Sequence, residues 1–204
     1  RGALTKYLIK KNCDLVCIEI DTDLKFYLDK YQSKKCKIIY EDILKVDIRK
    51  IAEEKNGGKP IKVVANLPYY ITTPIIMGLF ESEVPLDSIT VMVQKEVADK
   101  LIYEPDKKTD TPLGAYLKRT SEVNVLTFVD RSCFNPVPKV DSAFIRIDHK
   151  KDVTIRALSI LTALFRDPNK TRNNCLKNVY GKDFPLCLSE DTRNRLSYRA
   201  RQLT

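Results

Sequence analysis

The sequence contains one histidine and no closely spaced pair of cysteines. His149 stands alone, and the six cysteines are scattered at Cys13, Cys17, Cys36, Cys133, Cys175 and Cys187. A zinc site needs clustered cysteine and histidine ligands, so this scatter argues against a metal centre. Scattered thiols in a chain of 204 residues are typical of a reducing compartment and not of a disulfide scaffold. We therefore predict a cytoplasmic protein without a bound metal.

Long apolar runs are also absent. A membrane-spanning helix needs about 20 consecutive apolar residues, and no segment approaches that length. The first residues do not lead into the apolar core of a signal peptide. We therefore expect no membrane attachment. The chain opens with Arg1 and not with methionine, which we interpret as the mark of a fragment.

The formal net charge is +9, and most of it lies near the C-terminus. Residues 150–204 contain 12 Lys and Arg against 5 Asp and Glu, a net charge of +7, whereas residues 1–149 contain 24 against 22, a net charge of +2. This asymmetry fits an anionic partner, of which nucleic acid is the commonest. It fits a solvated basic helix face equally well.

Strand-like and helix-like segments alternate through the first hundred residues. Short apolar runs predict strands at 14–20, 36–40, 61–65 and 89–93, and helical patterns fall at 4–11, 22–31, 46–54, 73–81 and 94–103. The alternation predicts an α/β fold, a parallel sheet with helices on both faces. Segments 123–129 and 140–147 have the pattern of closing strands, and 104–112 that of a loop.

Beyond Lys150 the pattern becomes helical, at 155–165, 171–179 and 192–203. We therefore predict an α/β domain over residues 1–149 and a small basic helical domain over residues 150–204.

Polar residues stand where three predicted strands end. Glu19, Asp42 and Asn66 each close an apolar run. Ligands of parallel sheets bind at the carboxyl ends of the strands, so we expect these side chains to line one site. Other acids nearby are interpreted as caps of the helices that follow them, namely Asp21, Asp23 and Asp47.

Asn66-Leu67-Pro68-Tyr69 is the most informative group of residues. The amide oxygen of Asn66 and a nearby backbone carbonyl can accept hydrogen bonds from the exocyclic amino group of a base. Pro68 stiffens the turn and has no N–H, and Tyr69 offers a flat face for stacking. Taken alone, the four residues fit a plain strand-to-loop turn equally well.

The wider segment 63–74 closely resembles the catalytic motif of the KsgA/Erm family of rRNA adenine N6-dimethyltransferases, and the KsgA branch more than the Erm branch. Segments 18–24, 41–43, 93–98 and 134–142 also resemble that family, in its order. The resemblance implies a Rossmann-like, S-adenosylmethionine-dependent methyltransferase that dimethylates adenine N6 in small-subunit rRNA. The implied partner is this rRNA or the pre-ribosomal small subunit, and we expect a monomer.

The resemblance also implies roles for single residues. Glu19 would bind the ribose hydroxyls of S-adenosylmethionine and Asp42 its adenine amino group, with further cofactor contacts from Gly2, Ile20, Ile43 and Asn66. The catalytic motif is Asn66, Leu67, Pro68 and Tyr69, in which Asn66 and the Leu67 carbonyl orient the target N6. The lone histidine is in the wrong place to act as a base, so catalysis would rest mostly on positioning.

Two aromatic residues would hold the target base, Tyr69 on one face and Phe134 on the other, with core packing as the alternative for Phe134. The basic C-terminal segment would contact RNA phosphates without reading sequence. The residues implied there are Lys170, Arg172, Lys177, Arg193, Arg195, Arg199 and Arg201.

The sequence departs from the family at several points. The glycine-rich loop and the strand before it are missing, and residues 2–5 resemble only the tail of that loop. We therefore expect open edges on the neighbouring strands and weak activity in this chain as written. Residues 111–114 and 168–171 replace two other family segments, which puts the details of RNA contact in doubt.

Three alternatives remain. One is an Erm-like methyltransferase of large-subunit rRNA, and another is a DNA adenine methyltransferase. Leu67 and residues 70–74 favour the KsgA branch over the Erm branch, and Leu67 also argues against the DNA enzyme, which more often has proline or another residue there. The third is a non-catalytic RNA-binding assembly or transcription factor on the same fold. The missing glycine loop suits it, whereas the intact Glu19, Asp42 and 66–69 motif argue against it.

Overall fold

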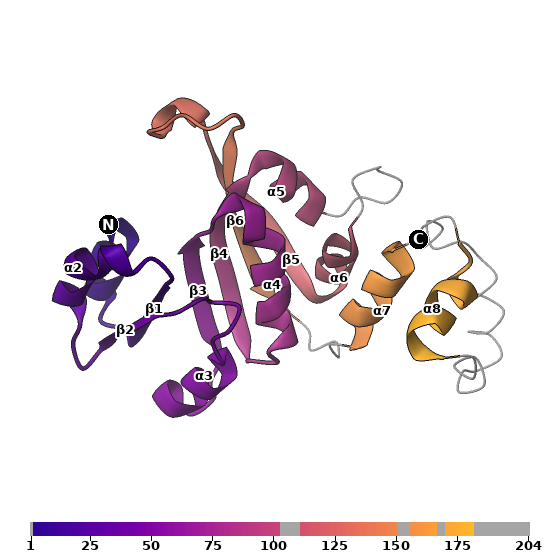
Figure 1. Ribbon diagram of the computed structural model, residues 1–204, viewed down its shortest axis with the longest axis horizontal. Helices are drawn as coiled ribbons and strands as arrows, with labels where there is room; N and C mark the ends of the chain where they lie inside the picture. The colour runs from indigo at the N-terminus through magenta and orange to yellow at the C-terminus, as the bar shows by residue number, and fades with distance from the viewer. Residues whose placement is uncertain (1, 103–110, 151–155, 167–169, 182–204) are drawn as a thin grey trace. The chain divides into compact units, whose positions relative to one another are not determined.

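The computed structural model describes residues 2–102, 111–150, 156–166 and 170–181 (Figure 1). These residues belong to two compact units. The first unit comprises described residues within 1–61 and 70–86, and the second comprises those within 62–69 and 87–204. The strands are correspondingly divided between a two-stranded and a four-stranded sheet.

A parallel pair of strands organises the first unit. β1 (Leu15–Glu19) runs beside β2 (Cys36–Tyr40), from Leu15 opposite Cys36 to Glu19 opposite Tyr40. The crossover that parallel strands need consists of η2 (Thr22–Leu24), α2 (Lys25–Leu28) and η3 (Asp29–Tyr31). α1 (Ala3–Leu8) and η1 (Ile9–Lys11) precede β1. The buried residues Leu28, Cys36 and Ile38 form the core between these elements.

Capping residues fix the helix ends of this unit. The Asp47 carboxylate accepts a 2.9 Å hydrogen bond from the backbone N of Lys50 at the start of α3 (Ile48–Asn56). Gly57 ends α3 in the left-handed conformation, with φ of 69°, which glycine adopts at little cost. Asp21 caps η2 by accepting from the backbone N of Asp23. The capping expected of Asp47 and Asp21 is therefore confirmed, whereas Asp23 lies inside the turn and is not the cap.

η4 (Tyr69–Ile71) leads into α4 (Thr72–Glu81). Pro74 is the third residue of α4, close enough to the start that its missing N–H costs no hydrogen bond of the helix. Four apolar side chains of α4 are buried: Ile75, Ile76, Leu79 and Phe80.

The second unit is built on a sheet with the strand order β3-β4-β6-β5. Its strands are β3 (Ile61–Asn66), β4 (Leu86–Gln94), β5 (Ser121–Val129) and β6 (Ser142–His149). Along β6 the fully buried Ile145 and Ile147 alternate with the exposed Arg146, the period of two that a strand imposes on its faces. Val91 and Val93 of β4 are also fully buried.

The closing strands of this unit, for which the sequence predicted no direction, run antiparallel to their neighbours. β6 pairs antiparallel with both β4 and β5. β5 and β6 are joined by residues 130–141 alone, a connection that returns the chain directly and so favours an antiparallel neighbour. A bulge between Val125 and Thr127 interrupts the ladder. Among the described strands β1 pairs only with β2, and β3 only with β4, so each keeps the open edge expected above.

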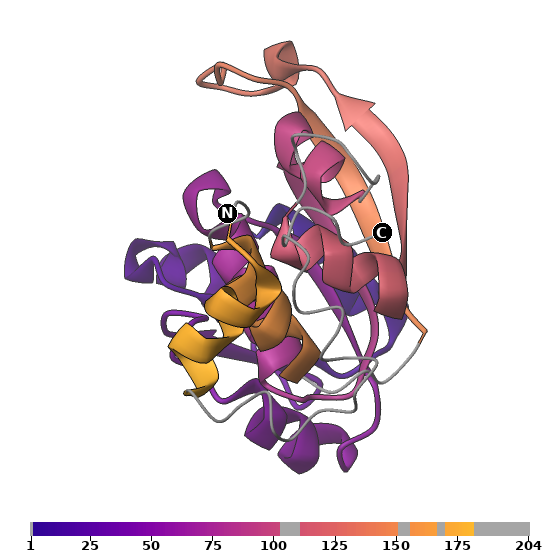
Figure 2. The same ribbon diagram turned by 90° about the vertical axis from the view of Figure 1, so that its right-hand side faces the viewer.

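Helices complete the second unit (Figure 2). α6 (Pro112–Thr120) packs against α5 (Lys95–Leu101), β5 and α7 (Arg156–Phe165), and α7 in turn packs against α8 (Arg172–Tyr180). Between α7 and α8 lies a small apolar cluster of Ala163, Leu164, Cys175 and Leu176. The predicted helix at 192–203 lies outside the described residues.

The sequence reasoning missed α6, because residues 104–112 were assigned to a loop and nothing was assigned after them. The signals were present. Thr111 caps the helix by accepting from the backbone N of Gly114, and Pro112 stands at the first helical position.

Gly114 of α6 lies close against the backbone of Lys100 in α5. A Cβ at this position would lie 2.4 Å from the backbone oxygen of Lys100. Gly114→Ala should therefore force the two helices apart and lower the free energy of unfolding by about 1–3 kcal/mol. Chemical denaturation monitored by circular dichroism measures the change.

Gly78→Ala is the matched control. Gly78 also lies in a helix, α4, but a Cβ there would meet nothing within 4 Å. Alanine should raise the stability by roughly 0.5–1 kcal/mol through helix propensity alone. Equal effects of the two substitutions would contradict the packing argument.

Candidate active site

Two acids meet at one edge of the first unit. Glu19 is the last residue of β1 and lies opposite Tyr40, the last residue of β2. Asp42 follows Tyr40 by two residues. Because the two strands are parallel, their carboxyl ends share one edge of the sheet. The structure therefore brings Glu19 and Asp42 to the same edge, as the sequence predicted.

Each of these acids also closes its own turn. Oε1 of Glu19 accepts a 3.0 Å hydrogen bond from the backbone N of Asp21, and Oδ1 of Asp42 accepts one of 3.0 Å from that of Leu44. Within the described part of the chain the second oxygen of each carboxylate has no hydrogen-bond partner. Each acid thus keeps one acceptor for a ligand.

Two apolar residues accompany these acids. Ile20, directly after Glu19, is 64% exposed, and Ile43, directly after Asp42, is half-buried. An exposed isoleucine between a strand and a polar turn gains little from the fold itself, so its surface is free for a flat apolar ligand.

Gly2 occupies a constrained position before α1. Its φ is +74°, and a Cβ there would lie 3.0 Å from side-chain atoms of both Leu28 and Tyr31. The backbone conformation and the packing thus both favour glycine at this point. Gly2, Glu19, Ile20, Asp42 and Ile43 all belong to the first unit.

Asn66 and the three residues after it belong to the second unit. Asn66 ends β3 with an exposed side chain that makes no hydrogen bond to any described residue. Leu67 is buried, which fixes the turn, and Pro68 is exposed. Tyr69 is half-buried, and its hydroxyl lies 2.7 Å from Oγ of Ser142. The turn thus presents a free amide beside a tethered aromatic ring.

Phe134 lies in the connection between β5 and β6, which projects beyond the sheet as an arm (Figure 1). It follows η5 (Arg131–Cys133), and its backbone N donates to the backbone oxygen of Arg131 over 3.2 Å. The Phe134 side chain is half-buried. The second unit therefore contains both aromatic residues of the predicted base site.

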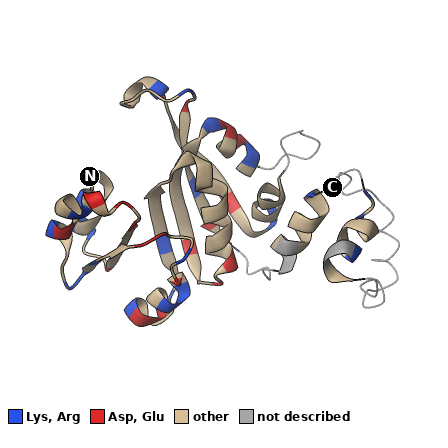
Figure 3. Cartoon of the chain, viewed as in Figure 1, with Lys and Arg blue, Asp and Glu red and all other residues tan. Residues whose placement is uncertain are grey.

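The basic residues predicted to contact RNA are partly described. Lys170 lies just before α8, and Arg172 and Lys177 lie on it; Lys170 is exposed and the other two are half-buried. No acid occurs in the described stretches 156–166 and 170–181, and the charged residues that Figure 3 shows on α8 are all basic. Four predicted contacts lie outside the described residues: Arg193, Arg195, Arg199 and Arg201.

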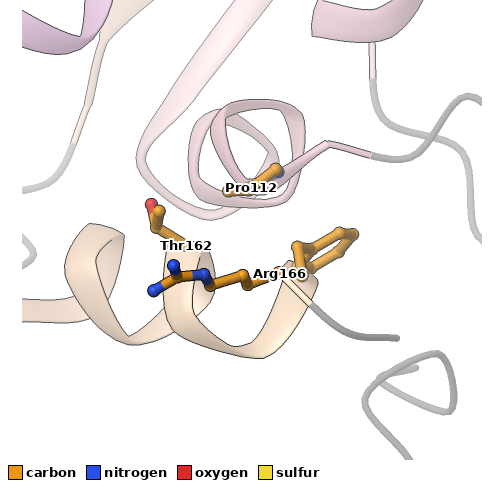
Figure 4. Close-up of a pocket in the computed structure, with 4 residues that line it drawn as sticks. Pro112, Thr162 and Arg166 are labelled. Carbon is orange, nitrogen blue, oxygen red and sulfur yellow. The ribbon is translucent and has the colours of Figure 1, made fainter. Parts of the chain in front are cut away.

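A shallow hollow of about 500 Å³ lies between the start of α6 and the end of α7 (Figure 4). Pro112, Thr162, Phe165 and Arg166 line it. None of the predicted site residues belongs to it, and it offers no carboxylate or amide to a base. The described residues contain no cluster of three potential metal ligands, and none of their helices is long and apolar enough to cross a membrane.

Sequence reasoning missed two residues with a direct bearing on the site. Tyr40 lies beside Glu19 at the sheet edge, and its hydroxyl donates a 2.7 Å hydrogen bond to Asp29. Ser142 holds Tyr69, although 73 residues separate them. Ser142 is the last residue of segment 134–142, which resembles the family, but no local sequence pattern links it to Tyr69.

Solved structures define the class of fold. A dimethyladenosine transferase from Plasmodium falciparum superimposes with a TM-score of 0.70 over 99% of this chain and 82% of its own, at 21% identity. The 23S rRNA methyltransferase ErmE superimposes with a TM-score of 0.61 over 88% of this chain and 72% of its own, at 24% identity. The chain therefore has the Rossmann-like fold of these methyltransferases.

Sequence comparison identifies the family. The model of the ribosomal RNA adenine dimethylase family matches residues 1–202, so the chain belongs to this family. Ribosomal RNA small subunit methyltransferase A of Lachnoclostridium phytofermentans is 45% identical over 87% of this chain, and its namesake from Streptococcus thermophilus is 37% identical over 96%. The chain spans 64% of the length of the first of these relatives and 68% of the second.

Tyr40 provides a reporter for the edge of the first unit. Desolvation, the hydrogen bond to Asp29 and the negative charges of Asp29 and Glu19 raise the pKa of Tyr40 from 10.0 to about 12. Asp29→Ala should therefore lower this pKa, and Glu19→Gln should lower it by less, because the Glu19 charge contributes less. Ultraviolet titration measures both shifts, with Tyr40→Phe to assign the signal. An unchanged pKa in Asp29→Ala would contradict the assigned contact.

Proposed function

We propose that the protein dimethylates N6 of adenines in small-subunit rRNA, with S-adenosylmethionine as the methyl donor. Family membership and the names of the relatives support this reaction. The observation that carries it is the turn at residues 66–69, where an exposed, unpaired amide stands beside a tethered aromatic ring. Amide and carbonyl acceptors suit an exocyclic amino group, and the ring suits its base.

The proposed cofactor contacts fit a nucleoside with a ribose and an amino-substituted base. Glu19 and Asp42 each retain one free carboxylate oxygen at a shared sheet edge, and a carboxylate accepts well from hydroxyl or amino groups. Ile20 and Ile43 supply apolar surface beside them, and Gly2 belongs to a segment that resembles the tail of the family's glycine loop. S-adenosylmethionine supplies an electrophilic methyl group on a sulfonium sulfur.

The chain's own part in the reaction is to orient the nucleophile. Oδ1 of Asn66 and the carbonyl of Leu67 would accept hydrogens of N6, two in the first methylation and one in the second, and so direct the nitrogen lone pair towards the cofactor. The cofactor would supply the methyl group, and N6 would release one proton in each transfer. His149 ends β6, at the opposite end from Ser142, and so is not placed to accept that proton.

The choice of RNA rests on the relatives. Their names specify the small subunit, which favours it over the large-subunit alternative, although the fold is shared with ErmE. We place the basic contacts in a helical domain over 150–204, with Lys170, Arg172, Lys177 and the four arginines beyond them facing phosphates. We expect a monomer that meets the pre-ribosomal small subunit in the cytoplasm.

Asn66→Ala tests the reaction itself. Removing the acceptor should lower kcat about 10²- to 10³-fold, the loss seen when one positioned catalytic hydrogen bond is deleted. Methyl transfer to unmethylated small-subunit rRNA measures it, in full-length protein. Asn124→Ala is the control, because Asn124 is another exposed asparagine of the second unit, on β5. Near-normal turnover of Asn66→Ala would refute the assignment.

Asp42→Ala tests the cofactor site. Loss of the acceptor for a buried amino group should weaken cofactor binding by about 1–3 kcal/mol and leave RNA binding unchanged. Calorimetry with each ligand separates the two. Asp47→Ala is the matched control, since Asp47 is a helix cap in the same unit. Asp47→Ala should lower the free energy of unfolding by about 0.5–2 kcal/mol without weakening cofactor binding. Equal effects of Asp42→Ala on both ligands would make Asp42 structural.

A further inference from the structure

The hydroxyl of Tyr69 is engaged inside the protein. It lies 2.7 Å from Oγ of Ser142, whose side chain is fully buried, while Tyr69 itself is half-buried. Stacking on a base uses only the face of the ring, which phenylalanine offers equally. The hydroxyl therefore has a separate use, which is to fix the direction in which the ring points.

Ser142 is a firm point of attachment. It is the first residue of β6 and lies opposite Gln94 in β4 and opposite Val129 in β5. Strands on both sides hold its backbone, so only the rotation of its hydroxyl remains free. A ring hydrogen-bonded to this hydroxyl is therefore attached to the start of an inner strand of the sheet.

Asp141, the residue before it, holds the base of the arm. Its backbone oxygen accepts a 3.0 Å hydrogen bond from the backbone N of Lys95 at the start of α5. Its Oδ1 accepts one of 3.1 Å from the backbone N of Arg131, the first residue of η5. The turn that Arg131 opens ends at Phe134, whose N–H bonds back to the carbonyl of Arg131. Asp141 thus attaches this turn to the sheet.

We propose that Asp141 and Ser142 form one anchor that positions both aromatic residues for the target base. Ser142 acts through the hydroxyl of Tyr69, and Asp141 acts through the turn that ends at Phe134. The inference rests on the proposed function, because the base site is part of it. Both are positioning residues, since neither touches the base. An aromatic ring fixed before the base arrives spares the cost of ordering it on binding.

A set of three variants tests the link between Ser142 and Tyr69. Tyr69→Phe keeps the stacking face and Ser142→Ala removes the partner, and each should lower kcat about 5- to 10-fold, the rate equivalent of one hydrogen bond. The KM for S-adenosylmethionine should stay unchanged. The double variant should be no slower than the slower single variant, because both remove the same bond. The assay is methyl transfer to unmethylated small-subunit rRNA by full-length protein.

Ser88→Ala is the matched control. Ser88 is a buried serine of the same sheet, opposite Asp148 near the far end of β6, and its hydroxyl bonds to its neighbour Asp87. It should change stability as Ser142→Ala does but leave kcat unchanged. A fall in kcat for Ser88→Ala equal to that of Ser142→Ala would reduce Ser142 to a structural residue and overturn the proposal.

The role of Asp141 in the anchor has its own test. Asp141→Ala should lower kcat about 5- to 10-fold, and Asp141→Asn, which keeps an oxygen for the N–H of Arg131, should restore most of it. In a Phe134→Ala background Asp141→Ala should cause no further loss.

The two levels of failure are distinguishable. Absent methyl transfer in the unaltered protein would overturn the proposed function and the anchor with it. Suppose instead that the unaltered protein transfers methyl groups normally. If the fold losses in kcat of the two single variants then multiply in each double variant, the anchor alone would be overturned. Wild-type kcat in Ser142→Ala would do the same.

Discussion

β6 is hydrogen-bonded to β4 on one side and to β5 on the other, and this central position governs the second unit. Three of its apolar side chains, Ala143, Ile145 and Ile147, are fully buried, so its register cannot slip without moving apolar groups into water. The same register sets where β6 begins. The residues at its start can therefore serve as fixed reference points for the segments that surround them.

The proposed catalytic turn relies on positioned acceptors and not on a general base. The side-chain amide of Asn66 and the backbone carbonyl of Leu67 are uncharged acceptors. The demand on the fold is then geometric, because a small displacement of a reacting atom costs rate even when every group is present. A catalytic turn of this kind needs support from outside its own segment. In this chain the buried Leu67 and the hydrogen bond between the hydroxyls of Tyr69 and Ser142 provide that support.

The sequence predicted well those features that depend on neighbouring residues. Strand β1, the cap at Asp47 and the helix end at Gly57 all follow from local patterns of apolar, acidic and glycine residues. Placing Glu19 and Asp42 at one edge required only the rule that parallel strands share their carboxyl ends. The two-domain boundary near Lys150 and the roles of the site residues stay predictions.

One of the missed features was local, and the others depend on contacts between distant residues. α6 was passed over because the two prolines of residues 104–112 suggested a loop, although the second of them, Pro112, begins the helix. The antiparallel pairing of β6 and the link from Ser142 to Tyr69 become visible only once the strand order is known.

Glu19 and Asp42 show how one carboxylate group can serve both the fold and a ligand. A chain that leaves a strand must satisfy the backbone N–H groups of its first turn, and a carboxylate two residues earlier does so. Each acid uses one oxygen in this way and retains the other. A serine in the same place would close the turn with its only oxygen and leave less for a ligand. Strand-end carboxylates thus support local folding before any ligand is present, and the edge at which they gather is the edge at which a ligand of a parallel sheet binds.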